Sequence, residues 1–526
     1  MSASQQKKLR QQQREEGTEK HQIAQQKLEK AQKRSTNRKT AGGIVAAVII
    51  LVIIALSTNL FYSNFTAVKI GDESYTAAEY NFFYNSYIQN FENQYGQYLQ
   101  MFGIDSSKPY NQQQYEEGKT WADFFKESTL NQMKELTALY SDAQNAGFVL
   151  SDEDKASLES AIESYKNSNA GTDYNSADSY LQALYGKGVT VKVTSSLLEK
   201  EYIAQAYATQ MNESFSYSDD ELGSYYAEHK DDLDKFTYIS YFADGTKSED
   251  ATSKDGTATS STDIAVSPSV SPAGDAAASD TTDPMEKAKT IADAIVATAT
   301  TVDEFKQAVL THTQTEASES TSAGSSLSAD YSEWLKDASR VAGDKTVINT
   351  DTGYYAIYFI SRDDNNYKTV NVRHILIKAV ADENGAYTEE AKSAAKKKAE
   401  DLLNEWKAGA ATEESFAELA NKNSEDTGSN TKGGLYENIY KGQMVTEFND
   451  WSFAEGRNIG DNGIVYGESG SYSGYHVIYF AGYGELYSNK LAEDEIRNKD
   501  FTDWKTALLG NFEVSEALTR FLLKEK

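Results

Sequence analysis

Two histidines lie in settings where their side chains could carry out chemistry. His374 lies in "RHILIK" (373–378) and His476 in "GYHVIYF" (474–480), both within runs of β-forming residues. They are two of only five histidines in 526 residues. A neutral imidazole donates one hydrogen bond and accepts another, so it can orient or polarise a bound group. The chain has no cysteine, which excludes disulfides and thiolate metal sites.

An internal repeat gives the first argument about these histidines. Three blocks recur in the same order, with separations of 117 residues (Trp334 to Trp451), 111 residues (Phe305 to Phe416) and 121 residues (Gly353 to Gly474). Chance matches seldom keep both order and spacing, so we infer two copies of one domain, at residues 235–362 and 369–483.

The two copies differ at the histidine positions. Aligning "FTYISY" (236–241) with "VRHILI" (372–377) places Tyr238 where the second copy has His374, and Tyr355 where it has His476. The first copy is therefore expected to form the same fold without either histidine. This favours a chemical role for His374 and His476 over a packing role.

Strand periodicity predicts which way His374 points. Alternate side chains of a strand face opposite sides of a sheet. Ile375 and Ile377 should therefore pack under helices, which leaves His374 on the other face. The helices are predicted at "TEEAKSAAKKKAEDLLNEWKAG", which has an apolar face and ends at Gly409, and from Thr412 onward.

Four motifs then occur in order across residues 369–483: "RHILIK", "FAELANKNSEDTGSNTKGG", "GQMVTEF" and "SGYHVIYF". In this ordered set the sequence resembles the parvulin family of peptidyl-prolyl cis–trans isomerases. The resemblance implies a β-sheet wrapped by helices, with two histidines facing each other. It also implies an enzyme that needs no metal and no cofactor.

The resemblance assigns roles to six residues of this chain. His374, Asp426 and His476 correspond to the catalytic positions. The substrate-binding positions are Met444 and Phe448, which would clamp the proline ring, and Ser473, a small polar position near the second histidine.

An X-Pro bond isomerises over a barrier of ~18–20 kcal/mol, which a dry pocket that favours the twisted amide would lower. In the first copy Thr315 falls at the Asp426 position, so that copy is predicted to be silent.

The chain departs from the family pattern after the double glycine. The family often has Asp-Leu there, whereas this chain has Leu435 and Tyr436. No arginine cluster follows Lys378, so specificity for phosphorylated segments is not expected. A parvulin fold kept as a binding module without turnover is the alternative reading.

The N-terminal region predicts a membrane anchor. Residues 1–40 carry eleven Lys/Arg and four Glu, and no charged residue occurs from Ala41 to Val68. The apolar segment approaches the ~20 residues that span a bilayer, and the positive-inside rule places the tail in the cytoplasm. A cleaved signal peptide ending near "ALS" (55–57) is the alternative. Both readings place the remaining body outside the cytoplasm, and we favour the uncleaved, single-pass anchor.

The body of the chain is strongly acidic. The formal charge of the whole chain is −29 although the tail contributes +7, so nucleic acid is not an expected partner. The predicted partners are unfolded or newly exported polypeptides, the membrane, and a second copy of the chain in a homodimer.

The predicted fold class is α+β, with a single N-terminal transmembrane helix, a helical SurA-N-like chaperone lobe and two parvulin-like α+β domains, the first degenerate. The predicted segments are a basic tail (1–40), an anchor (41–61), a helical chaperone domain (66–234), the degenerate copy (235–362) with a disordered insert (244–283), the isomerase copy (369–483) and C-terminal helices that return to the helical lobe (485–526). Whether the helices form only their own core or a cradle with exposed apolar patches stays open.

This layout resembles membrane-anchored exported foldases of the PrsA/SurA type. The resemblance implies an extracytoplasmic foldase that isomerises X-Pro bonds in exported proteins. A non-catalytic holdase or scaffold at the export site is the alternative from another functional class. A third is an adhesion or envelope-structural protein, which the acidic, tyrosine-rich body permits although no motif supports it.

Overall fold

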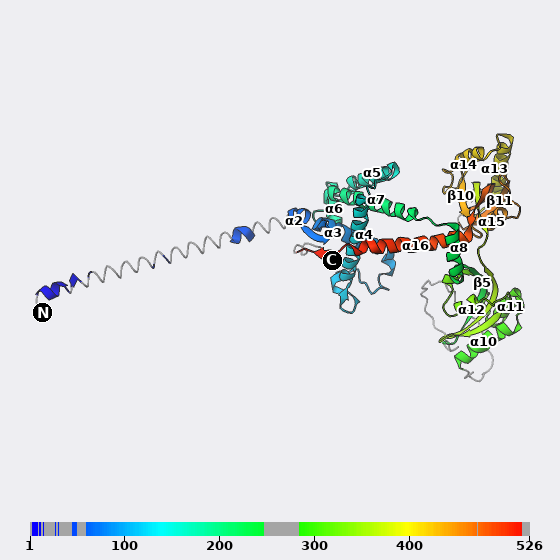
Figure 1. The fold of residues 1–526 in the computed structure, drawn as a ribbon, viewed down its shortest axis with the longest axis horizontal. Coiled ribbons are helices and arrows are strands. Elements are labelled where there is room, and N and C mark those ends of the chain that lie inside the picture. Colours follow the sequence, from blue (N-terminus) through cyan, green and yellow to red (C-terminus); the bar gives the residue numbers. More distant parts are fainter. Residues whose placement is uncertain are drawn as a thin grey trace. The chain divides into compact units, whose positions relative to one another are not determined.

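The computed structural model describes residues 59–246, 283–470 and 472–517, and short stretches before residue 50. The chain divides into two compact units, Met1–Phe215 with Lys499–Lys526, and Ser216–Asn498 (Figure 1). Most of the predicted tail, anchor and insert lies outside the described residues. Within the residues that are described, no helix combines the length and apolar character needed to cross a membrane.

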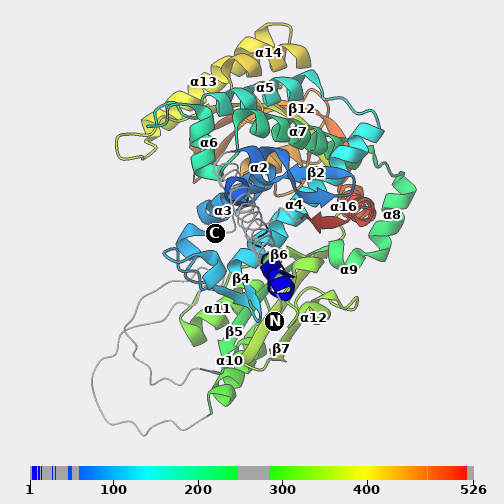
Figure 2. The same ribbon diagram turned by 90° about the vertical axis from the view of Figure 1, so that its left-hand side faces the viewer.

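The first unit is mainly helical (Figure 2). Its helices are α2 (Leu60–Asn64), α3 (Ala77–Tyr95), α4 (Trp121–Asn145), α5 (Asp152–Lys166), α6 (Ala177–Tyr185) and α7 (Val191–Ser214), with 3-10 turns η1 (Gly96–Tyr98) and η2 (Tyr110–Gln112). Its strands are β1 (Thr66–Ile70), β2 (Glu73–Thr76), β3 (Gln114–Glu116), β4 (Lys119–Thr120) and β13 (Val514–Glu516). Helix α3 begins at a capping box, in which Thr76 and Glu79 satisfy each other's backbone N–H groups.

An aromatic core holds this unit together, and the C-terminal segment contributes to it. Side chains such as Phe83 and Phe125 are almost fully buried in the core. Strand β13 pairs with β1, and Trp504 and Phe512 pack against the same core. Residues 504–516 therefore complete a unit that begins more than 400 residues earlier.

The second unit contains both copies of the repeat. The first copy has β5 (Lys235–Asp244), α10 (Pro284–Thr298), α11 (Val302–Thr313), β6 (Ser320–Ala323), η3 (Gly324–Ser326), α12 (Ser332–Lys336), β7 (Lys345–Asn349) and β8 (Gly353–Asp363). The second has β9 (Lys368–Lys378), α13 (Glu389–Ala408), α14 (Glu413–Asn423), β10 (Leu435–Ile439), α15 (Thr446–Ser452), β11 (Asn462–Ser469) and β12 (Tyr472–Leu486). The sheets are β6-β5-β8-β7 and β10-β9-β12-β11, so corresponding strands occupy the same places in both copies.

Two further helices, and the part of a third up to Asn498, complete the second unit. Helix α8 (Asp219–Glu228) and helix α9 (Lys230–Leu233) belong to it, although the sequence placed them in the helical domain. They form a small core in which Leu222 and Leu233 are buried together with Ala492 of α16 (Tyr487–Gly510). This contact assigns α8 and α9 to the unit that holds the two sheets.

The second-copy sheet buries both of its faces. Ile375, Ile377 and Val477 pack under α13 and α14, as the strand periodicity predicts. On the opposite face Val372 and Ile478 form a separate core with α15. His374 and His476 belong to this second face.

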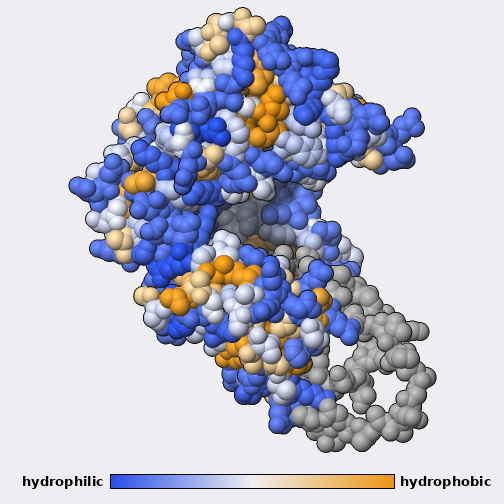
Figure 3. Space-filling model, turned by 90° about the vertical axis from the view of Figure 1, so that its right-hand side faces the viewer, coloured by the Kyte–Doolittle hydropathy of each residue, from blue (hydrophilic) through white to orange (hydrophobic). Residues whose placement is uncertain are grey.

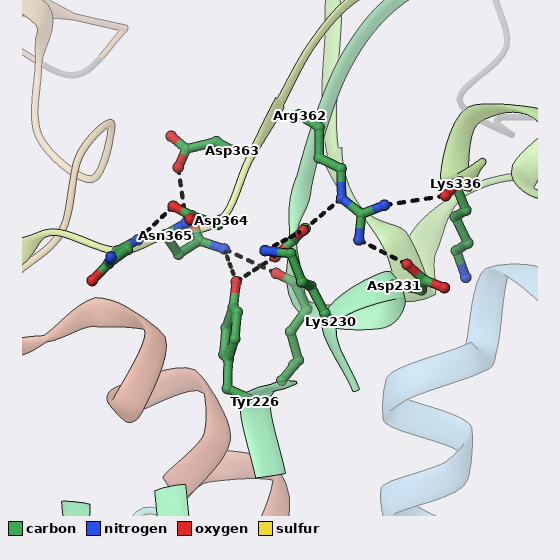
Figure 4. A network of polar contacts seen from close by, with 11 residues as sticks. Tyr226, Lys230, Asp231, Lys336, Arg362, Asp363, Asp364 and Asn365 are labelled. Carbon is green, nitrogen blue, oxygen red and sulfur yellow. Dashed lines mark hydrogen bonds and ion pairs between the residues drawn. The ribbon is translucent and has the colours of Figure 1, made fainter. Parts of the chain in front are cut away.

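A polar network lies where α9, β5 and β8 meet (Figure 4). Asp234 is fully buried and accepts a hydrogen bond from Arg362 Nε at 2.6 Å and another from the Tyr226 hydroxyl at 2.7 Å. Asn365 donates from Nδ2 to that hydroxyl and to the Leu233 carbonyl, each at 3.0 Å. Arg362 thus compensates the charge of the buried Asp234 carboxylate, and Asn365 fixes the segment that follows β8.

The face of the molecule that Figure 3 shows is largely hydrophilic. On the face that Figure 3 shows, apolar side chains form several separate patches among hydrophilic ones. This distribution agrees with the acidic composition of the body.

Candidate active site

Neighbouring strands bring the two histidines together. In the antiparallel pairing of β9 and β12, His374 lies opposite Ile478 and His476 lies opposite Leu376. Both imidazoles are buried, and their Nδ1 atoms lie 3.1 Å apart. The rings stack with centroids 5.3 Å apart. Residues separated by 102 positions therefore share one hydrogen bond.

Asp426 lies beside His374, in the turn that follows α14. Its Oδ2 is 2.8 Å from His374 Nε2, and the Ser429 hydroxyl donates to the same carboxylate. The hydrogen bond from His374 is the main reason why the pKa of Asp426 lies well below its usual value. Asp426 is therefore an ionised acceptor at neutral pH.

His476 is held neutral. Burial is the main cause that lowers its pKa to about 3, and the charge that His374 can carry lowers it further. Its Nε2 lies 3.0 Å from the Tyr472 hydroxyl. The His476 imidazole thus stays uncharged at neutral pH.

These contacts assign the proton positions when His374 is also neutral. Because ionised Asp426 can only accept, His374 Nε2–H donates to it, and His374 Nδ1 is left as an acceptor. His476 then donates from Nδ1, and its Nε2 accepts from Tyr472. The hydrogen bonds run in one direction, from Tyr472 through His476 and His374 to Asp426.

An apolar wall adjoins the histidine pair. Phe448 is almost fully buried, and its ring meets those of His374 and His476 edge-on at centroid distances of 5.6 and 5.3 Å. Met444 is half-buried and packs in the same cluster. The structure therefore places both predicted clamp residues beside the polar chain.

Two glycines make room for the site. A Cβ atom at Gly434 would lie 2.2 Å from the His374 carbonyl oxygen, and the backbone there has φ +70°. A Cβ atom at Gly467 would lie 2.6 Å from His476 Nε2. Any larger side chain at either position would displace a histidine.

Ser473 is not brought to the site. It lies an odd number of residues from His476 on a regular stretch of strand, so it faces the other side of the sheet. Its buried hydroxyl lies 2.9 Å from that of Tyr466, whose ring packs on Tyr475. The prediction that Ser473 contacts substrate is therefore corrected: it supports the helix-covered face.

Three further residues contact the polar chain. Ser429 follows Asp426 in the same turn, Tyr436 donates its hydroxyl to Asp426 Oδ2 at 3.0 Å, and Tyr472 contacts His476. Sequence reasoning did not name them as site residues. Only Tyr472 carried a usable signal, because it precedes His476 by four residues on a strand and so shares its face.

The first copy has a different set of residues at this place. Strand β5 pairs Ser240 with Ile357, whereas β9 pairs His374 with Ile478. Ile357 and Ile478 correspond at the repeat separation of 121 residues, so Ser240, and not Tyr238, occupies the His374 position. A two-residue shift keeps the same face of a strand, so sequence pattern alone did not reveal this error.

Tyrosines fill the space in that copy. Tyr355 occupies the His476 position, and its ring meets Tyr331 edge-on at 5.1 Å. The hydroxyls of Tyr331 and Tyr238 lie 3.2 Å apart in a buried contact. The two histidines and the carboxylate of the second copy have no counterpart in these residues.

Comparisons with known proteins show which family the domain that contains this site is similar to. Residues 354–481 match the family described as the PPIC-type PPIASE domain. This match confirms the parvulin resemblance of the sequence motifs and includes every predicted site residue. No curated protein matches the chain.

Several solved structures are similar to parts of the chain. The peptidylprolyl isomerase PrsA from Bacillus anthracis is 24% identical over 28% of this chain and 59% of that one, with a TM-score of 0.18. PrsA from Bacillus subtilis is 13% identical over 74% of this chain and 84% of that one, with a TM-score of 0.27. The foldase protein PrsA from Streptococcus pneumoniae is 11% identical over 78% and 97%, with a TM-score of 0.24. The chain thus spans less than two thirds of the Bacillus anthracis protein.

Proposed function

We propose that this chain, which carries a parvulin-type peptidyl-prolyl isomerase domain, is a membrane-anchored extracytoplasmic foldase that isomerises X-Pro bonds in exported polypeptides. One observation carries the catalytic part. A continuous hydrogen-bonded chain of Asp426, His374 and His476 borders an apolar wall formed by Met444 and Phe448. All the residues of this site lie within 354–481, the segment that matches the PPIC-type family.

The site can lower the barrier without forming a covalent bond. The planar amide is stabilised by resonance, which is lost when the C–N bond twists. Phe448 and Met444 hold the proline ring, so that rotation moves the group on the other side of the bond. The twisted amide is less dipolar than the planar one, and a pocket with little water favours it.

The polar chain gives this pocket a stable shape. Asp426 holds His374, and His374 together with Tyr472 holds His476, so both rings present a constant surface to the substrate. Neutral His476 adds no charge that would stabilise the dipolar planar amide. In this proposal the histidines work mainly through orientation and local polarity.

The helical unit is proposed to hold unfolded segments that the isomerase domain then processes. Its aromatic core, with large side chains such as Tyr80 and Phe83, gives a rigid frame for such a surface. Newly exported polypeptides are the proposed clients. A homodimer and the absence of nucleic-acid partners stay predictions from the sequence.

Turnover is the measurement that separates this proposal from a holdase. The full-length protein should accelerate cis–trans isomerisation of a short proline peptide, which takes tens to hundreds of seconds unaided. A fragment of residues 235–362 should give no rate above background, because Ser240 and Tyr355 replace the two histidines. Circular dichroism would verify that the fragment is folded.

Two outcomes would contradict this scheme. An inactive full-length protein that still binds unfolded chains would support the holdase. Turnover by the folded first copy would show that the roles of the histidines are wrongly assigned.

The proposed topology rests on the charge pattern of the first 68 residues. Protease added to intact protoplasts should degrade the body and leave the basic tail, because positive flanks remain in the cytoplasm. Antibodies against the two ends of the chain would follow each part. Protection of the body would overturn the topology. Loss of the tail from the membrane fraction before protease is added would instead indicate a cleaved signal peptide.

A further inference from the structure

The helical unit contains a cavity of about 750 Å³. Side chains from α3, α4, α5, α6 and α7 line it. The floor is apolar and buried and includes Phe82, Phe83, Leu136, Leu139 and Ala204. The rim is polar and exposed and includes Asn90, Asn93, Gln132 and Gln205. A segment that enters would meet amide groups first and apolar surface below them.

One carboxylate in the wall has no ion-pair partner among the residues that the structure describes. Glu201 of α7 is half-buried in the cavity lining. Burial raises the pKa of Glu201 to about 7, and burial is the one cause of this shift. A cation close to the carboxylate would have lowered this pKa. The wall therefore offers a carboxylate that no cation in the described part of the unit compensates.

The other titratable groups of the cavity do not supply a cation. Glu135 of α4 already pairs with Lys505 Nζ at 3.0 Å. Tyr165 of α5 is neutral, because burial, with smaller effects of Tyr185 and Glu201, raises its pKa to about 12. Burial likewise raises the pKa of Tyr185 of α6. The charge of the lining is negative overall.

Aromatic rings surround the same space. Phe82 meets Tyr185 edge-on at a centroid distance of 5.0 Å and Tyr165 at 6.2 Å. Lysine and arginine side chains combine a cation with an apolar stem, and aromatic rings attract such cations. A carboxylate among aromatic rings therefore complements a basic side chain better than an apolar or acidic one.

We propose that this cavity binds a short extended client segment in which a lysine or arginine stands beside an apolar residue. The basic side chain pairs with Glu201, the apolar neighbour reaches the floor, and the rim amides bond the client backbone. The inference rests on the proposed function, in which the helical unit holds unfolded chains, and it specifies the clients. The volume lies in the range of ~300–1,000 Å³ typical of pockets that bury a drug-sized ligand, enough for a few side chains of a client segment.

Binding should depend on pH through Glu201. The empty cavity holds this group about half protonated near pH 7, whereas a bound cation requires the ionised form. Affinity for a basic segment should therefore rise between pH 6 and pH 8, with release of a proton on binding at the lower pH. Tyr165 and Tyr185, which share the lining, stay neutral in this range because burial raises the pKa of both hydroxyls.

The test uses the full-length protein and two fluorescent peptides that differ only in one residue, lysine or norleucine, next to a phenylalanine. At pH 8 the wild-type protein should bind the lysine peptide about tenfold more tightly, the usual effect of a hydrogen bond to a charged group. Glu201→Gln should remove both this preference and its pH dependence. The matched control is Glu199→Gln, an exposed residue of the same helix outside the cavity, which should change neither.

Three results would overturn the proposal: no preference for lysine in the wild type, an undiminished preference in Glu201→Gln, or equal competition by lysine amide alone, which would indicate a site for free amines. Thermal melts at pH 8 check folding, and Glu201→Gln should melt no lower than the wild type because it removes a buried charge. Isomerase activity is measured in parallel. If all variants lack turnover, the proposed enzyme function fails, while the peptide preference can still be read.

Discussion

Replacing either His374 or His476 with alanine should lower kcat/KM for a proline peptide by about tenfold to a hundredfold. His374→Ala removes the hydrogen bond to ionised Asp426, and a bond to a charged group contributes ~1.5–3 kcal/mol. His476→Ala removes the hydrogen bond that holds the His374 ring in place. The double replacement should cost less than the sum of the two free energies, because the Nδ1 atoms share one hydrogen bond at 3.1 Å. Some activity should remain, since Phe448 and Met444 still hold the proline.

The four-member cycle is measured with thermal melts to exclude unfolding. His312→Ala is the matched control, because His312 is exposed on α11 of the first copy and should leave kcat/KM unchanged. Full activity of the double variant would remove the histidines from the mechanism. Additive losses would show that the two rings act separately.

Asp234→Ala should destabilise the second unit by ~3–5 kcal/mol, the usual cost of removing one partner of a buried ion pair. Asp234 has no exposed surface and pairs with Arg362 Nε at 2.6 Å, and Lys230 and Tyr226 also contact it. The change leaves the Arg362 guanidinium without its most buried partner. Urea unfolding, followed in the transition of this unit, measures the loss.

A neighbouring carboxylate provides the control. Asp232 pairs with Lys336 at 2.8 Å but its side chain is 56% exposed, so Asp232→Ala should cost only ~0–1 kcal/mol. Adding Arg362→Met to Asp234→Ala should recover part of the loss, because it removes the uncompensated charge. Equal effects of Asp234→Ala and Asp232→Ala would show that burial of this network does not stabilise the unit.

Local sequence patterns were enough to predict much of this protein. The repeat, the strand that carries His374 and the helices that cover it follow from spacing and periodicity, which depend on near neighbours in the chain. The parvulin motifs indicated the isomerase domain, and the histidines, Asp426, Met444 and Phe448 all lie together in the structure. These features could be predicted because each depends on a short stretch of sequence.

The details that decide chemistry depended on how distant segments meet. Sequence could not show that Ser240 replaces His374, because this depends on the register that a strand adopts. The orientation of Ser473, in contrast, follows from strand alternation, although the family resemblance assigned it to the site. Tyr436 of β10 donates a hydrogen bond to Asp426 because the turn after α14 places that carboxylate beside the strand. The uncompensated charge of Glu201 exists only because separate helices enclose it. Residue types and periodicity are properties of local sequence, whereas burial, charge compensation and register arise only when segments far apart in the chain pack together.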